Sequence, residues 1–382
     1  MMARSPALRR LGRTLAGVWK TRYPCFLFGL PLKHAEIPVF TYHDVDPESF
    51  TQDLTFLQEN GYRTLTTDEF IRLNGRSDGE RAVLLTFDDA PRNFWEVAFR
   101  LLNKFNAKAT VFVPTDWING TSNLQEQANK ENHSRDDFMT WDHLRACLRS
   151  GLVDVQSHAH RHALVFTSTK LVGFASPKFL ARHPLYDWPM RRVGEHDILG
   201  RPPLGTPIYE ASPLLSAEFR VLEEECVVKA CQDCVAAGGD EAFFDRKDWS
   251  RRLRVVHDEA WRRSNSGSLM DPGGFRMLVE SEFRLSRELF ERELGMRPRY
   301  LAFPWMLGSP PTLELAAEAG IQAVFGVGMD FRLIRRLKSP IPAHGRFKGD
   351  WLRFLPGRGR RKLQDVIPQK VLGFLNSQHL AH

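Results

Sequence analysis

The fold is decided by residues 81–113, which read RAVLLTFDDAPRNFWEVAFRLLNKFNAKATVFV. Residues 83–86 form a short apolar run that is typical of a buried strand, and Asp88 and Asp89 end it. A helical pattern follows, and residues 109–113 have the composition of a second buried strand. The stretch therefore predicts a strand, a loop, a helix and another strand.

Two adjacent carboxylates stand at the carboxyl end of the first of these strands. In α/β folds this edge of the sheet carries the chemistry, because loops converge there on side chains whose position the strand fixes. Neighbouring residues of an extended chain point in opposite directions, so Asp88 and Asp89 should have different roles. The alternative is that one of them only caps the next helix, since Pro91 suits a first helical turn.

The length and composition are those of a globular protein. The chain has 382 residues, of which 42% are hydrophobic and 26% charged, enough for one large α/β domain with an insertion or for two domains. Five unevenly spread cysteines favour a reducing compartment over a disulfide framework. Cys226, Cys231 and Cys234 could bind zinc with His257, but thiols packed in a helix are the alternative in this Val- and Ala-rich segment.

Basic residues gather near both ends of a chain whose formal net charge is +7. Leucines at helical spacing make residues 1–36 a basic amphipathic segment that suits an anionic membrane surface. A second cluster at 358–362, within a basic tail predicted for residues 351–382, could press on the same surface. The alternative for both is a solvated charged face or a phosphate-facing rim. We find no apolar run long enough for a signal peptide or a membrane span.

Alternating strand and helix patterns continue on both sides of this central stretch. Residues 37–42 are predicted to form the first strand, which ends at His43. Regular patterning returns at residue 283 and continues to residue 327. This alternation favours a parallel sheet or barrel, which we place at residues 37–164 and 281–350.

The region between these two parts is irregular. Residues 165–280 are rich in Pro and Arg, and helical patterns occur only at 215–237 and 249–263. We interpret the region as an insertion, acting as a lid or a substrate collar, because a loop this long inside a compact domain usually has a function.

Three histidines follow a predicted strand at residues 152–156. His158 and His162 are four residues apart, so one helical turn would place both imidazoles within reach of one metal ion, with His160 pointing away. A basic surface loop is the alternative. Because the cluster follows a strand, it should lie at the same edge of the sheet as Asp88 and Asp89.

Together these stretches resemble the polysaccharide deacetylase (NodB-homology) family. The motifs that carry the resemblance follow predicted strands and stand in the family's order: Thr86-Phe87-Asp88-Asp89, then His158 to His162, then Phe303-Pro304-Trp305 with Gly308 one residue late. Tyr42-His43 and Asn60-Gly61-Tyr62 are similar to the branch that deacetylates poly-N-acetylglucosamine. Three motifs in order are far more specific than any one of them.

The resemblance implies a fold and a set of roles. The fold would be an α/β irregular (β/α)7-type barrel with a large, mostly helical or irregular insertion. Asp89, His158 and His162 would bind a divalent metal, most simply Zn²⁺, with positions left open for water and the substrate carbonyl. Asp88 would be the general base, and the main-chain N–H of Trp305 would help to hold the oxyanion.

Two positions stay open in this comparison. The proton donor to the leaving amine would be His43, which matches the branch whose first-strand histidine has this role, or His344, near the end of the barrel. His43 could also be a capped strand-end histidine. Phe303 stands where many relatives have an Arg that pairs with the base, and Arg346 could substitute from another loop.

These assignments predict a hydrolase that removes an N-acetyl or N-formyl group from an amino sugar of a glycan or glycolipid. The basic start and the missing secretion signal predict a cytoplasmic protein, peripheral on the inner face of the membrane. A non-catalytic carbohydrate-binding member of the same fold is the alternative, although the complete set of acids and histidines favours the enzyme. Nucleic-acid binding is disfavoured, because stacking aromatics are not interleaved with the Arg clusters.

Overall fold

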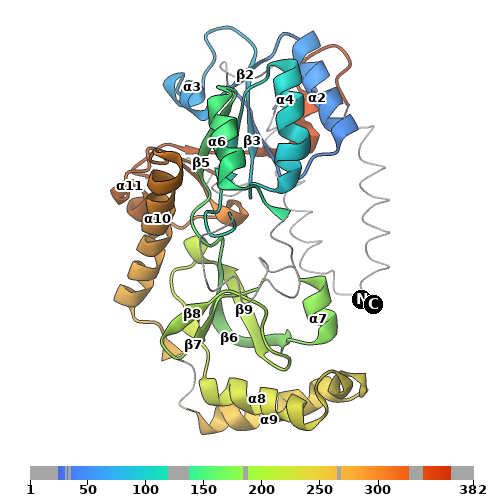
Figure 1. Ribbon diagram of the computed structural model, residues 1–382, viewed down its shortest axis with the longest axis vertical. Coiled ribbons are helices and arrows are strands. Elements are labelled where there is room, and N and C mark those ends of the chain that lie inside the picture. Colours follow the sequence, from blue (N-terminus) through green and yellow to red (C-terminus); the bar gives the residue numbers. More distant parts are fainter. Residues whose placement is uncertain are drawn as a thin grey trace.

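The computed structural model describes residues 25–30, 32, 36–118, 137–183, 188–264, 268–326 and 339–362. Most of the basic segment predicted for residues 1–36 lies outside these ranges, as does the part of the predicted tail beyond residue 362. Figure 1 shows the α/β part of the chain at the top and the insertion below it.

A nine-stranded parallel sheet forms the α/β part. Its order is β14-β13-β12-β5-β4-β3-β1-β15, with β2 beside β3. The strands are β1 (Val39–Tyr42), β2 (Arg63–Leu65), β3 (Ala82–Phe87), β4 (Ala109–Val113), β5 (Val153–Ser157), β12 (Tyr300–Ala302), β13 (Ala323–Phe325), β14 (Ala343–His344) and β15 (Phe347–Lys348). Only Gly345 and Arg346 separate the two end strands in the chain, so the sheet curls back on itself. The predicted irregular barrel is confirmed.

Helices cover the outside of the sheet, and local signals start several of them. The helical elements are α2 (Pro47–Glu59), α3 (Thr67–Arg72), η3 (Phe94–Ala98), α4 (Phe99–Phe105), α6 (Trp141–Arg149), α10 (Pro272–Leu294) and α11 (Pro310–Glu318). Thr66 and Thr140 form capping boxes at α3 and α6. The predicted helix after the acid pair begins with the π-helical turn η3, a form that is frequent beside functional sites.

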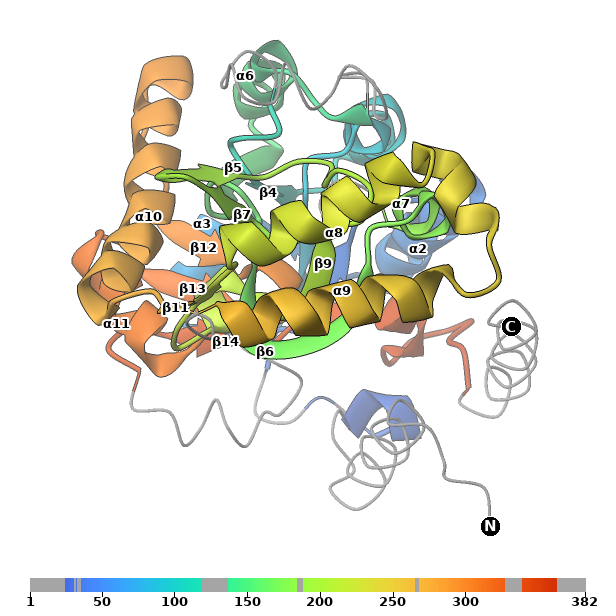
Figure 2. The same ribbon diagram turned by 90° about the horizontal axis from the view of Figure 1, so that it is seen from below.

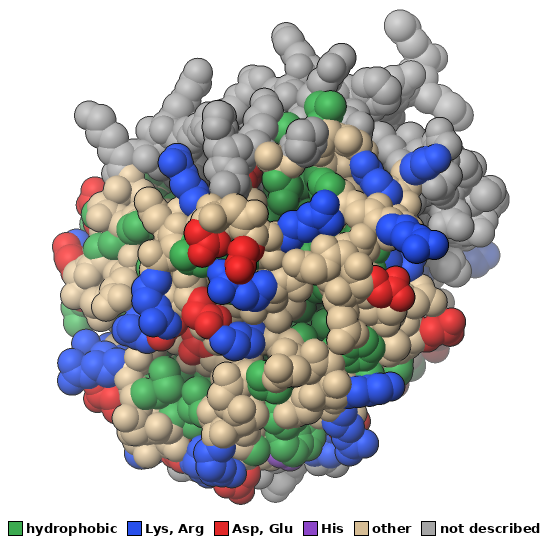
Figure 3. Space-filling model, turned by 90° about the horizontal axis from the view of Figure 1, so that it is seen from above, with side chains coloured by type: hydrophobic (Ala, Val, Ile, Leu, Met, Phe, Trp, Pro, Cys, Tyr) green, Lys and Arg blue, Asp and Glu red, His purple; other side chains and the backbone are tan. Residues whose placement is uncertain are grey.

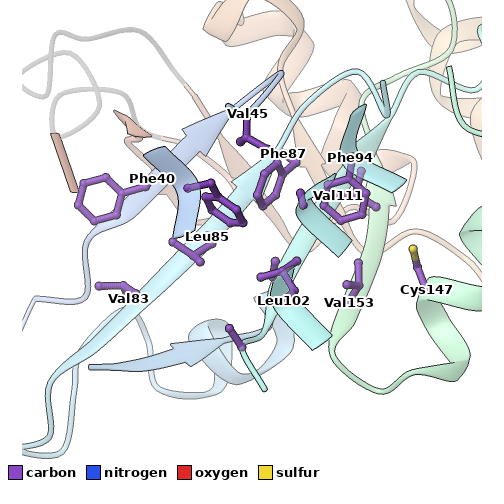
Figure 4. Packing of buried hydrophobic residues seen from close by; sticks show 14 of the residues in the cluster. Phe40, Val45, Val83, Leu85, Phe87, Phe94, Leu102, Val111, Cys147 and Val153 are labelled. Atoms are coloured by element: carbon purple, nitrogen blue, oxygen red, sulfur yellow. The ribbon is translucent and has the colours of Figure 1, made fainter. Parts of the chain in front are cut away.

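β3 is buried on both faces, which explains its continuous apolar run. Val83, Leu85 and Phe87 face a hydrophobic cluster under the helices (Figure 4). Leu84 points the other way, into a cluster contributed mainly by strands, which is the interior of the barrel. Asp88 continues the inward-facing series of Leu84, because side chains of a strand alternate.

The insertion contains more strand than its sequence indicates. Its elements are β6 (Leu164–Phe174), α7 (Pro177–Arg182), β7 (Arg191–Val193), β8 (His196–Ile198), β9 (Pro207–Pro213), η6 (Leu214–Ser216), β10 (Val221–Leu222), α8 (Glu225–Ala237), η7 (Asp240–Asp245), α9 (Trp249–Arg263) and β11 (Ser268–Leu269). β6 and β9 pair antiparallel between the barrel and the α8–α9 pair (Figure 1), and Figure 2 shows α8 and α9 in front of the other elements.

One of the two helices predicted in the insertion is confirmed and the other is only half right. The prediction for 249–263 matches α9. The prediction for 215–237 is wrong before Glu225, where η6 and the short strand β10 precede α8. Before Glu225 the chain pairs instead with β11, and the buried Arg220 guanidinium lies 2.6 Å from a carboxylate oxygen of Asp197; local sequence shows neither contact.

Two boundaries predicted between segments of the chain, at residues 280 and 351, fall inside helical elements. α10 continues through the limit at residue 280, and η9 (Gly349–Phe354) continues through the limit at 351. η1 (Cys25–Phe28), from the predicted basic segment, packs Phe26 against Phe347 with ring centroids 5.3 Å apart. The barrel core therefore draws on residues outside 37–350.

The described surface carries charges of both signs. On the face opposite the insertion, Lys and Arg side chains lie among Asp and Glu side chains (Figure 3). Within the described part of the chain, no helix has the length and apolar character that crossing a bilayer requires.

Candidate active site

The registers of the sheet align the carboxyl ends of its strands at one edge. Tyr42 pairs with Phe87, and Ser157 pairs with both Val113 and Leu301. Residues that follow these ends are consequently brought together although they are distant in the chain. They are His43, Asp88, Asp89, His158 and Phe303.

Asp89, His158 and His162 form the one group of potential metal ligands found among the described residues, with ligand atoms all within 4.8 Å of one another. Asp89 Oδ1 lies 3.4 Å from His158 Nε2 and 3.6 Å from His162 Nε2. His158 Nδ1 lies 2.9 Å from the carbonyl oxygen of Ala302, which can only accept, so Nδ1 carries the proton. The Nε2 lone pair of His158 is thus free to face a cation.

These residues fit a divalent cation. Burial lowers the pKa of His158 to about 4, and burial together with nearby His158 lowers the pKa of His162 well below its usual value. Both imidazoles are therefore neutral near pH 7, the form that binds metal. Burial and the charge of Asp88 raise the pKa of Asp89, whose buried Oδ1 accepts no hydrogen bond from the described residues. A cation between these atoms would satisfy this oxygen.

The loops of the site hold strained backbone. Of the nine non-glycine residues with positive φ in the described ranges, six belong to these loops: Asp89, Ala90, Ala159, His162, Trp305 and Met306. Such conformations cost about 1–3 kcal/mol each and persist where the surrounding structure imposes them. The predicted helical turn from His158 to His162 is wrong, because left-handed Ala159 and His162 make this stretch a loop.

Asp88 lies beside the ligand group and pairs with Arg346. The Arg346 guanidinium donates to both carboxylate oxygens, at 2.6 and 2.7 Å, and both side chains are buried. Burial alone would raise the pKa of Asp88, but the charge of Arg346 and its hydrogen bonds outweigh it and hold the pKa below its usual range. Asp88 is therefore ionised throughout the physiological range.

The structure answers the question that Phe303 raised. The Phe303 side chain, which has no charge to offer Asp88, is fully buried in a hydrophobic cluster with α10 and α11. A Cβ on Gly308 would come within 2.7 Å of the Phe303 ring, which explains the glycine at that position. Arg346, which the sequence only allowed as a substitute, is the cation that pairs with Asp88.

Aromatic rings surround His162. The Trp117 ring centroid lies 4.9 Å from that of His162. The ring centroid of Trp305, a residue of the third motif, lies 5.1 Å from that of His162. Trp305 keeps 37% of its surface exposed. We did not predict Trp117 from the sequence, and the only signal available was an aromatic residue soon after the end of a strand.

The two histidines considered as proton donors differ in their surroundings. His43 Nε2 lies 3.6 Å from Asp89 Oδ2, and 60% of the His43 side chain is exposed. The ring of His344 instead packs against Phe70 and Phe325, with centroids 4.9 and 5.3 Å away, and burial lowers its pKa to about 4.

Residues 75–174, which include the acid pair and the three histidines, match the family model described as polysaccharide deacetylase. In this stretch the chain is similar to the polysaccharide deacetylase family. Relatives of this family share parts of the sequence. The chain is 28% identical over 142 residues to the poly-beta-1,6-N-acetyl-D-glucosamine N-deacetylase of Escherichia coli K12, which covers 34% of this chain and 21% of that protein. It is 29% identical over 126 residues to the enzyme of the same description from Staphylococcus epidermidis, covering 32% and 39%. The chain thus spans well under half the length of these relatives.

Two solved deacetylase structures share the fold. The de-N-acetylase from Aggregatibacter actinomycetemcomitans aligns over 81% of this chain and 94% of its own, with a TM-score of 0.50 and 18% identity. The deacetylase domain of BpsB from Bordetella bronchiseptica aligns over 84% and 97%, with the same TM-score and identity. The likeness extends beyond the matched motifs to most of the chain.

Proposed function

We propose that this protein is a divalent-metal-dependent hydrolase that removes an N-acetyl, or N-formyl, group from an amino sugar of a glycan or glycolipid. The observation that carries the proposal is the meeting of Asp89, His158 and His162 around one point, with the ionised Asp88 beside them. The names of the relatives from Escherichia coli and Staphylococcus epidermidis support an N-acetylglucosamine polymer as the kind of substrate.

Each residue of the site has a role in this proposal. Asp89, His158 and His162 would hold the cation, which when bound polarises an amide carbonyl and makes water more acidic. Asp88 takes the proton of the water that attacks the amide carbon. The Trp305 N–H donates to the oxygen on which negative charge develops. The carbon–nitrogen bond then breaks as the amine nitrogen receives a proton, which gives a carboxylic acid and the free amino sugar.

We assign the proton donation to His43. Its side chain is exposed and next to Asp89, where a substrate amine can reach it, whereas His344 is enclosed by Phe70 and Phe325. With a pKa of about 4, His344 also carries no proton to give near neutral pH.

Replacing the two histidines separately tests this assignment. We expect His43→Ala to lower kcat by about 100-fold or more with zinc content unchanged, because a positioned general acid contributes about 10²–10⁴-fold. We expect His344→Gln to lower the melting temperature through lost ring packing while kcat per folded molecule stays near that of the wild type. A kcat loss confined to His344→Gln would reverse the assignment.

The function itself is tested by metal analysis and by release of free amine from N-acetylglucosamine oligomers. The proposal expects one bound divalent metal, and amine release that a chelator stops and added zinc restores. Bound metal without amine release from any N-acetylated glycan would instead support a carbohydrate-binding member of the fold.

The proposed location is the inner face of a membrane, with a lipid-linked sugar or glycan precursor as substrate. Support comes from the basic residues near both ends, of which those before Cys25 lie outside the described residues. In the described part, Arg360 of the second cluster donates to the Phe26 carbonyl oxygen at 2.7 Å, so this cluster packs against the end of the basic segment. Recovery of the protein from the medium rather than from cell membranes would contradict this location.

A further inference from the structure

The loop that carries His158 and His162 lies against α10, and a buried acid on that helix contacts it. Glu282 is 1% exposed. Its Oε2 accepts hydrogen bonds from the backbone N–H groups of His160, at 3.2 Å, and Arg161, at 2.8 Å. Its Oε1 lies 2.7 Å from Nε of Arg161. One carboxylate thus holds the middle of a loop whose first and last residues are the two histidines.

Other contacts also fix this loop in place. One turn along α10, Ser286 Oγ lies 2.9 Å from Ser157 Oγ, which accepts from the N–H of Ala159 at 3.0 Å. The opposite side of the loop is held by the end of β4, where Thr115 Oγ1 lies 2.9 Å from His160 Nδ1. His160 therefore faces away from the ligand group and anchors the loop, as the sequence predicted for its direction.

The contacts of Glu282, Ser286 and Thr115 hold the loop in a strained backbone conformation. Ala159 has φ of 63° and His162 has φ of 53°, conformations that a free loop would leave. A loop that relaxed would change the distance between the His158 and His162 imidazoles. Other conformations of the loop would leave the buried N–H groups of His160 and Arg161 without an acceptor, which costs free energy. Glu282 therefore favours the observed conformation.

We infer that Glu282 is a positioning residue, which fixes the loop from His158 to His162 so that both imidazoles meet one cation. The inference rests on the proposed metal-dependent function and extends it to a residue that touches neither metal nor substrate. Glu282 acts through the backbone N–H groups of the loop and through Arg161. Groups of this kind, which orient ligands from outside the coordination sphere, typically change metal affinity by about 10–100-fold when they are removed.

Two substitutions and one matched control test the inference. Glu282→Gln keeps the shape and one acceptor oxygen but loses the charge next to Arg161, whereas Glu282→Met removes both. Glu288→Gln is the control, since Glu288 is on the same helix and pairs with Arg284 on the surface. We expect the dissociation constant for zinc to rise about 10-fold in Glu282→Gln and about 100-fold in Glu282→Met, with no change in Glu288→Gln.

The measurement must separate positioning from a general loss of stability. Zinc affinity is determined by competition with a chelator at a temperature where circular dichroism shows every variant folded. The visible absorption of the cobalt-loaded proteins then reports the ligand geometry, and we expect it to change only in the Glu282 variants. A residue that merely stabilised the fold would lower the melting temperature and leave both readouts unchanged.

The possible failures are distinguishable. If the wild type itself binds no zinc, the proposed function fails, and the inference that rests on it fails with it. If the wild type binds zinc and the folded Glu282 variants bind it with the same affinity and the same cobalt spectrum, the inference is wrong. Should Glu282→Met not fold, Glu282→Gln, which has nearly the same volume, decides the question alone.

Discussion

His158→Ala is expected to lower the affinity for zinc by at least about 100-fold and to abolish turnover. A structural zinc site binds with roughly 10–16 kcal/mol shared among about four ligands, and each 1.4 kcal/mol is a factor of ten. Loss of one imidazole therefore removes two or more powers of ten. Asp89→Ala should have the same effect, because its Oδ1 faces both histidines at 3.4 and 3.6 Å. Zinc content after dialysis and isothermal titration measure the result.

The control for this experiment is a histidine away from the ligand group. His196 in β8 is exposed, and His196→Ala should bind zinc like the wild type. His162→Ala should behave like His158→Ala. Full zinc content in His162→Ala together with loss in His160→Ala would show that the wrong pair of histidines has been chosen as ligands.

Asp88→Asn is expected to keep the metal and to lose about 10²–10⁴-fold in kcat. The amide has nearly the shape of the carboxylate but cannot take the proton of the attacking water, and general bases contribute about this much to the rate. Zinc content and amine release, measured on the same sample, check the two halves of the prediction.

Arg346 complicates this experiment and also provides its control. Asp88→Asn leaves a buried guanidinium without its counter-charge, which can destabilise a protein by about 3–5 kcal/mol, whereas replacing both partners of a buried pair is often tolerated. We therefore expect the double variant with Arg346→Met to regain stability in a denaturant titration but not turnover. Recovery of turnover in the double variant would mean that Asp88 is needed only for structure.

The sequence predicted the ligand group because its parts follow strand ends in local patterns. Asp89 comes after an apolar run and His158 comes after an alternating strand pattern, so parallel pairing alone brings them to one edge of the sheet. The conformation around them was not predictable in the same way. Asp89 and His162 have left-handed backbone, which depends on tertiary contacts such as those of Glu282.

Residues that act across the fold were harder to identify from local patterns. The pairing of Arg346 with Asp88 depends on how the sheet closes, which periodicity does not report. Glu282 offered a clue that we did not use, since it is a polar residue on the buried stripe of α10 that also contains Phe283 and Leu289. The regular pattern found in the sequence began at residue 283, one residue after Glu282, and therefore excluded it. Arg220 shows the same limit in the insertion, because its contact with Asp197, 23 positions away, is not visible in the local pattern.

The position of Arg346 has a consequence for biosynthesis. Asp88 and Arg346 are 258 positions apart, and Arg346 lies between β14 and β15, the two end strands of the sheet. At about 5–20 residues per second, a ribosome needs roughly 10–50 s to add the guanidinium after the carboxylate has been made. Throughout that interval one edge of β1 has no partner strand, and Asp88 has no counter-ion. A nascent chain released before residue 346 consequently lacks the counter-ion of Asp88 and has an open strand edge, the kind of surface on which aggregation starts.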